Sequence, residues 1–142
     1  MVTVVTLVPS ILPTPFPDAL GFALLVNVAY FVCMSVAHWT SFKIPILFIY
    51  YDVGSNAYQD KIISFCALTY GILFYAAYSH RAVVPYAIAS LAATTAGLAA
   101  INSSGDLKEA LPPGAPLMAY WIQTFMIAAI TGTLWILYLS TK

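Results

Sequence analysis

The sequence predicts an all-α membrane protein, a four-transmembrane-helix bundle with a short interfacial segment after the first helix. Hydrophobic residues make up 62% of the chain and charged residues only 7%, whereas a soluble domain carries about 25% charged residues. So few charged residues could not cover the surface of a water-soluble protein, so the surrounding solvent must be largely lipid. The apolar residues also gather into four runs close to the roughly 20 residues that cross a bilayer as a helix. Segments containing proline, glycine and polar residues precede the second and fourth runs, whereas only His80 and Arg81 lie between the second and third.

The four predicted spans belong to one transmembrane domain covering the whole chain, and they fall at 19–39, 61–79, 82–101 and 117–139. Asp18 stands directly before the first span and suits a helix N-cap. His80 and Arg81 leave only a very short turn after the second span, so the second and third spans should form an antiparallel hairpin. Pro85 falls in the first turn of the third span, where proline is tolerated.

Three segments lie outside the predicted spans. Residues 1–17 hold four prolines and no positive charge, which argues against a signal peptide and predicts an interfacial arm. Residues 44–51 are apolar but too few to cross a bilayer, so an interfacial or re-entrant segment is expected there. Residues 102–116 are predicted to form a polar loop.

Four spans place both ends of the chain on one side of the membrane, called side A here, which carries Arg81 and Lys142. The opposite side, side B, carries Lys43, Lys61 and Lys108. Two cations against three do not decide the orientation by the positive-inside rule. The chain has no basic cluster, so nucleic-acid binding is not expected.

Polar side chains gather at side B, above all in residues 50–61. The candidate acid–base pair is His38 with Asp60, because both are titratable and fall at the same membrane face. Candidate ligand-binding residues are Asn27, Tyr51, Asp52, Asn56, Tyr58, Gln59 and Gln123. The competing and favoured interpretation is ordinary surface polarity, with Asn56 capping the second span. For Asn27, at mid-membrane, the favoured alternative to ligand binding is an interhelical hydrogen bond to Tyr70 or Thr94.

No cofactor is predicted. Ligation of a single haem or pigment by His38 is weighed, but an interfacial histidine beside Trp39 is preferred. The other histidine, His80, falls at the opposite face, which disfavours bis-histidine haem and leaves no metal site. Cys33 and Cys66 fall at similar depth, so a disulfide is considered, although two apolar filler residues are favoured.

The third span carries two ridges of small residues at four-residue spacing: Ala89, Ala93 and Gly97, and Ala92, Ala96 and Ala100. Such ridges let helices approach closely in lipid, so this span is predicted to be the central packing helix. It could also bind other membrane subunits or a second copy of the chain. The chain lacks the common catalytic motifs.

The leading hypothesis is therefore a non-enzymatic accessory or assembly subunit of a larger membrane complex. The first alternative is a small interfacial enzyme that uses the side-B polar residues. The second is an oligomeric transporter of ions or small solutes, with a polar path lined by Asn27, Tyr30, Ser64 and Thr94.

Overall fold

The computed structural model describes residues 18–42 and 57–141. Within these ranges the regular secondary structure is all helical, with no strand. Four helices are long and apolar enough to cross a membrane, as predicted. The helical elements are α1 (Ala19–Trp39), α2 (Ala57–Ser79), the short 3-10 helix η2 (Arg81–Val83), α3 (Val84–Ser103), α4 (Gly105–Ala110) and α5 (Met118–Ser140).

The predicted boundaries hold closely except in two places. Helix α1 has the predicted bounds, and the backbone N–H of Gly21 donates to the Asp18 carboxylate at 2.8 Å, so Asp18 is the expected cap. Helix α2 begins four residues earlier than predicted. The predicted loop at 102–116 is wrong in part, because α3 continues to Ser103 and α4 forms a further helical turn. The expected N-terminal arm and interfacial segment lie outside the described residues.

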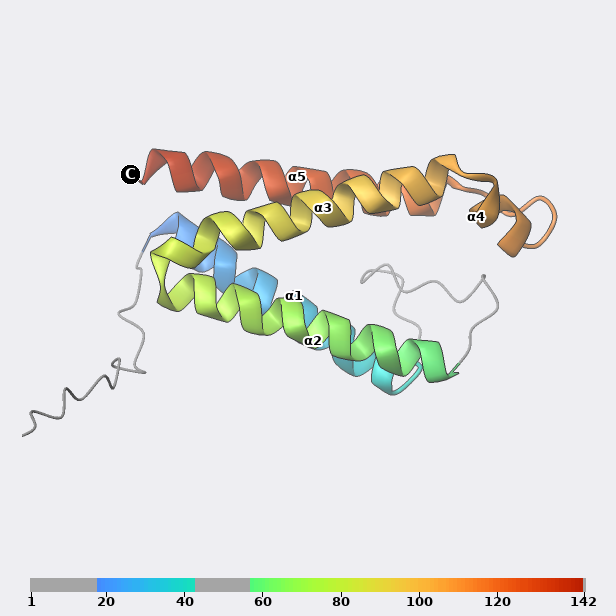
Figure 1. Cartoon of the computed structure of the whole chain (residues 1–142), viewed down its shortest axis with the longest axis horizontal. Helices are drawn as coiled ribbons and strands as arrows, with labels where there is room; N and C mark the ends of the chain where they lie inside the picture. Colours follow the sequence, from blue (N-terminus) through green and yellow to red (C-terminus); the bar gives the residue numbers. More distant parts are fainter. Residues whose placement is uncertain (1–17, 43–56, 142) are drawn as a thin grey trace, which may run out of the picture.

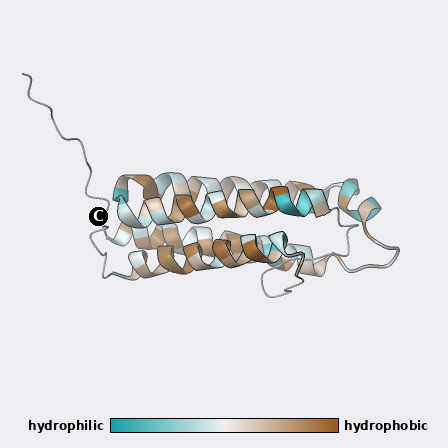
Figure 2. Cartoon of the chain, turned by 90° about the horizontal axis from the view of Figure 1, so that it is seen from below, coloured by the Kyte–Doolittle hydropathy of each residue, from teal (hydrophilic) through white to brown (hydrophobic). Residues whose placement is uncertain are grey.

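The long helices form two antiparallel pairs, α1 with α2 and α3 with α5 (Figure 1). The helix pairs lie close together at the end that holds η2 and diverge toward the end that holds α4 (Figure 1). Helix α1 begins and α5 ends at the η2 end, which is therefore side A. Hydrophilic segments are most prominent near the opposite end, side B (Figure 2).

The hydrophobic core occupies the side-A half of the bundle. Each long helix contributes a fully buried leucine or phenylalanine: Leu24, Phe74, Leu91 and Leu134. All four lie in the halves of their helices nearest side A. Phe31 links this core to the middle of the bundle, since its ring stacks on Tyr70 at 4.9 Å and on Phe74 at 5.6 Å between centroids. Among the described residues, all buried polar side chains except Asn27 lie in the halves of their helices nearer side B.

Small residues of α2, and not the predicted ridges of α3, make the close helix–helix contact. The prediction that the third span is the central packing helix is therefore wrong. Ser64, Ala67 and Gly71 are buried along the α2 face that meets α1. A Cβ atom added to Gly71 would lie 3.4 Å from Val32 Cγ2 and 3.9 Å from Phe31 Cβ. By contrast, the two small-residue ridges of α3 are exposed along their whole length.

Two groups of side-chain hydrogen bonds connect α5 to the rest of the chain. At side A, Arg81 donates to the Thr141 hydroxyl at 2.6 Å and to the Thr141 carbonyl. A cation at this helix end also complements the helix dipole. Toward side B, the buried Asn102 amide donates to the Tyr120 carbonyl at 3.0 Å and to the Thr124 hydroxyl at 2.8 Å. These bonds fix α5 against α3 where the apolar core ends.

Candidate functional site

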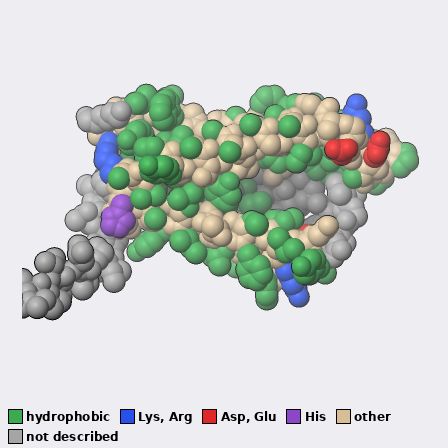
Figure 3. Space-filling model, viewed as in Figure 1, with side chains coloured by type: hydrophobic (Ala, Val, Ile, Leu, Met, Phe, Trp, Pro, Cys, Tyr) green, Lys and Arg blue, Asp and Glu red, His purple; other side chains and the backbone are tan. Residues whose placement is uncertain are grey.

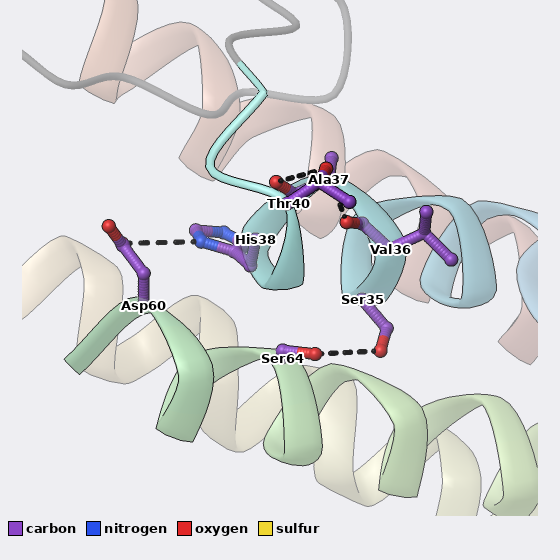
Figure 4. A network of polar contacts seen from close by, with 7 residues as sticks. All are labelled: Ser35, Val36, Ala37, His38, Thr40, Asp60 and Ser64. Carbon is purple, nitrogen blue, oxygen red and sulfur yellow. Dashed lines mark hydrogen bonds and ion pairs between the residues drawn. The ribbon is translucent and has the colours of Figure 1, made fainter. Parts of the chain in front are cut away.

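The candidate site is a buried polar contact between α1 and α2, close to side B. His38, in the last turn of α1, places Nδ1 3.5 Å from Oδ1 of Asp60, in the first turn of α2 (Figure 4). His38 is 8% exposed and Asp60 is 7% exposed. The structure thus brings together the two residues that the sequence nominated as an acid–base pair. Their catalytic role stays a prediction.

The two side chains form a long polar contact and not a hydrogen bond. The 3.5 Å separation exceeds the roughly 2.7–2.9 Å of a charge-assisted hydrogen bond between nitrogen and oxygen. His38 Nδ1 is fully shielded and has no hydrogen bond within the described part of the chain.

A second polar contact lies one helical turn deeper. The buried hydroxyls of Ser35 and Ser64 are 3.1 Å apart, again joining α1 to α2 (Figure 4). Both serines also line a lipid-side groove of about 310 Å³. Its remaining walls are mainly apolar: Val36, Trp39, Phe65 and Leu68. The Lys61 ammonium lies 5.5 Å from the centre of the Trp39 ring, at the mouth of the same helix pair.

The other nominated residues do not join this contact. Tyr58 and Gln59 are exposed on the first turn of α2, and Tyr58 is 72% exposed. Gln123 is half-buried on α5, the partner of α3. Figure 3 shows the acidic side chains of α4 at the far end of the α3–α5 pair. Three further candidates lie outside the described residues: Tyr51, Asp52 and Asn56.

Asn27 is buried, but its predicted interhelical bond is wrong. Its amide Nδ2 donates to the Ala23 carbonyl of its own helix at 2.8 Å. The two predicted partners bond to each other instead, since the Tyr70 and Thr94 hydroxyls lie 2.6 Å apart. The amide therefore turns back onto α1, and the α2–α3 contact is made without it.

Cys33 and Cys66 are both free and exposed, so the disulfide considered from their depth is wrong. They lie on the outer faces of α1 and α2 and are not core filler residues either. Among residues 18–42 and 57–141, no three of the histidine, cysteine and acidic side chains come together as a metal site would require.

Two polar residues of the helix contacts escaped the sequence analysis. Ser35 shares the buried face of Phe31 and His38, at spacings of four and three residues, so helical periodicity could have identified it. Asn102 was assigned to a loop, but it lies eleven residues after the buried Leu91 and continues that face of α3. An eleven-residue spacing is close to three full helical turns.

Comparison of the chain with known protein families, curated proteins and solved structures finds no match. The chemistry of the contact is accordingly argued from its own residues. An imidazole beside a carboxylate can accept, hold or donate a proton, and the same pair can also lock two helices together.

Proposed function

We propose that the chain is an integral, multi-pass membrane protein that serves as a non-catalytic accessory or assembly subunit of a larger membrane complex. The observation that carries this proposal is the exposed α3 surface, where both small-residue ridges face away from the bundle. Small residues pack poorly against lipid chains but let another helix approach closely. The α3 ridges are thus suited to a helix that is not supplied by this chain.

Gly97 is the last residue of the first ridge and is exposed on this surface. A Cβ atom added there would meet no atom within 4 Å. The glycine therefore serves no close approach within the bundle, although glycine costs about 1 kcal/mol relative to alanine inside a helix. Close contact with an external helix would account for its position. Self-association through the same ridges would use the same geometry.

Gly97→Leu is expected to weaken association at least tenfold, because a leucine side chain would hold the partner helix away from α3. The matched control is Gly132→Leu on α5, where an added Cβ also meets nothing within 4 Å. The measurement is recovery of co-purifying membrane proteins after gentle solubilisation, followed by native electrophoresis. Unchanged recovery with Gly97→Leu, or migration of the wild-type chain only as a free monomer or homodimer, would contradict the subunit proposal.

The second candidate function is a small interfacial membrane enzyme. It is favoured by the His38–Asp60 contact beside a groove whose floor carries the Ser35 and Ser64 hydroxyls. In such a site the carboxylate would orient the imidazole, and the imidazole would transfer the proton.

The enzyme proposal predicts loss of function when either side chain is replaced. Asp60→Asn and His38→Ala should each lower activity by at least a hundredfold at normal protein levels, as expected for removal of a general acid or base. Complementation of a strain that lacks the protein measures this, with immunoblotting to check abundance. Full complementation by both variants would exclude the enzyme and leave the subunit proposal standing.

A further inference from the structure

A groove between α1 and α5 holds polar groups with unused hydrogen-bonding capacity at the depth of the membrane centre. Its volume is about 380 Å³, within the range of about 300–1,000 Å³ typical of small-molecule pockets. The lining is Phe22, Ala23, Val26, Asn27, Met126, Ala129, Ile130, Thr133 and Leu134. All of these except Asn27 and Thr133 are apolar.

Asn27 contributes one of these groups. The residue is only 6% exposed, and its Nδ2 is already bonded to the Ala23 carbonyl. No hydrogen bond formed by the described residues engages its Oδ1. An amide carbonyl has two acceptor sites, and lipid chains supply no donor for them. A group that donates a hydrogen bond would therefore be stabilised in the groove.

Thr133 contributes the other polar group of the groove. Every other threonine in the described residues donates its hydroxyl to a carbonyl of its own helix. The Thr133 hydroxyl makes no such bond. Asn27 lies eight residues from the side-A end of α1, and Thr133 lies seven from the side-A end of α5. Because helices rise equally per residue, the two side chains lie at matching depth on opposite walls.

We propose that this groove binds a compact, membrane-soluble alcohol or phenol. Its hydroxyl would donate to Asn27 Oδ1 and accept from Thr133, while its apolar body would pack against Phe22, Met126 and Ile130. An unsubstituted acyl chain would leave both polar groups unpaired. The headgroup of a phospholipid does not reach the membrane centre. The proposal is independent of the subunit role, because the groove uses no residue of α3.

The test uses the full-length chain in phosphatidylcholine vesicles and two photoreactive probes: a diazirine-bearing dialkylphenol and its O-methyl ether. The phenol should label peptides within 22–27 and 126–134, at least fivefold more strongly than the ether, because the ether cannot donate to Asn27 Oδ1. Thr133→Val and Asn27→Leu should each lower phenol labelling about fivefold, and Asn27→Leu should leave ether labelling unchanged, because only the phenol donates to Asn27. Thr69→Val is the control, since Thr69 is exposed on α2 and bonds only to its own helix.

Several results would overturn the proposal. Equal labelling by phenol and ether would mean that the groove selects no donor. Labelling spread evenly over all lipid-facing surfaces would mean that it is no site. A dimer that dissociates on Asn27→Leu would assign the groove to a second copy. Thr133→Val preserves side-chain shape, so it keeps the test decisive even where Asn27→Leu lowers the yield of folded protein.

Discussion

Replacing Asp60 alone by leucine is expected to destabilise the folded chain by about 3 kcal/mol, because it would leave a buried polar group without its partner. The carboxylate faces an imidazole that is only 8% exposed and has no described hydrogen bond at Nδ1. Without Asp60, that nitrogen would be left buried and unpaired at the α1–α2 contact. His38→Leu alone should have a comparable effect, because it would leave the carboxylate buried.

The double variant His38→Leu with Asp60→Leu is expected to recover most of the lost stability, because apolar side chains of similar volume can replace a buried pair at little cost. Unfolding of the full chain by denaturing detergent, followed by helical circular dichroism, gives the four free energies of a double-mutant cycle. Tyr58→Leu is the control, since Tyr58 lies two residues away and is 72% exposed. Additive losses in the double variant would show that the two side chains do not interact.

This cycle also separates the two proposed functions. If the double variant folds and still assembles, the pair serves only to stabilise the contact between α1 and α2, and the subunit proposal gains support. If it folds but no longer complements a deletion strain, the pair has a chemical role. Stability and function are thus read from the same four proteins.

Much of the fold follows from the sequence because lipid imposes a simple rule. Backbone groups in a bilayer must bond within helices, so each long apolar run predicts a span. Periodicity then predicts which face of a span is buried. By helical periodicity Asn27, Phe31 and His38 fall on one face of α1, and all three are buried. Placing His38 beside Asp60 required only that α1 and α2 be antiparallel, so that α1 ends and α2 begins at the same membrane face.

The pairing of the helices did not follow from the sequence. Small residues recur on both α2 and α3, and their spacing does not say which set meets a helix of the same chain. In the structure Ser64, Ala67 and Gly71 of α2 contact α1, whereas the longer ridges of α3 are exposed. Likewise the sequence does not show that the Asn27 amide bonds the Ala23 carbonyl of its own helix and not a neighbouring helix.

Gly71→Leu is expected to destabilise the chain by about 2–3 kcal/mol, in the range measured for overpacking in closely packed interiors. A Cβ atom at this position would already contact Val32 Cγ2 at 3.4 Å, with Phe31 Cβ and the Val28 carbonyl oxygen both at 3.9 Å. The three further carbons of leucine would have no room between α1 and α2. The helices would have to separate, which would also weaken the Ser35–Ser64 and His38–Asp60 contacts on the same face.

Gly97→Leu provides the comparison, because both substitutions make the same gain in helix propensity and differ only in surroundings. The space around Gly97 is open, so this variant should be as stable as the wild type while losing its association with other helices. Detergent unfolding measures the first property and native electrophoresis the second. Equal stability of the two leucine variants would mean that α1 and α2 do not approach closely at Gly71. Unequal stability, with association lost only in Gly97→Leu, would assign the α2 stripe to folding and the α3 ridges to assembly.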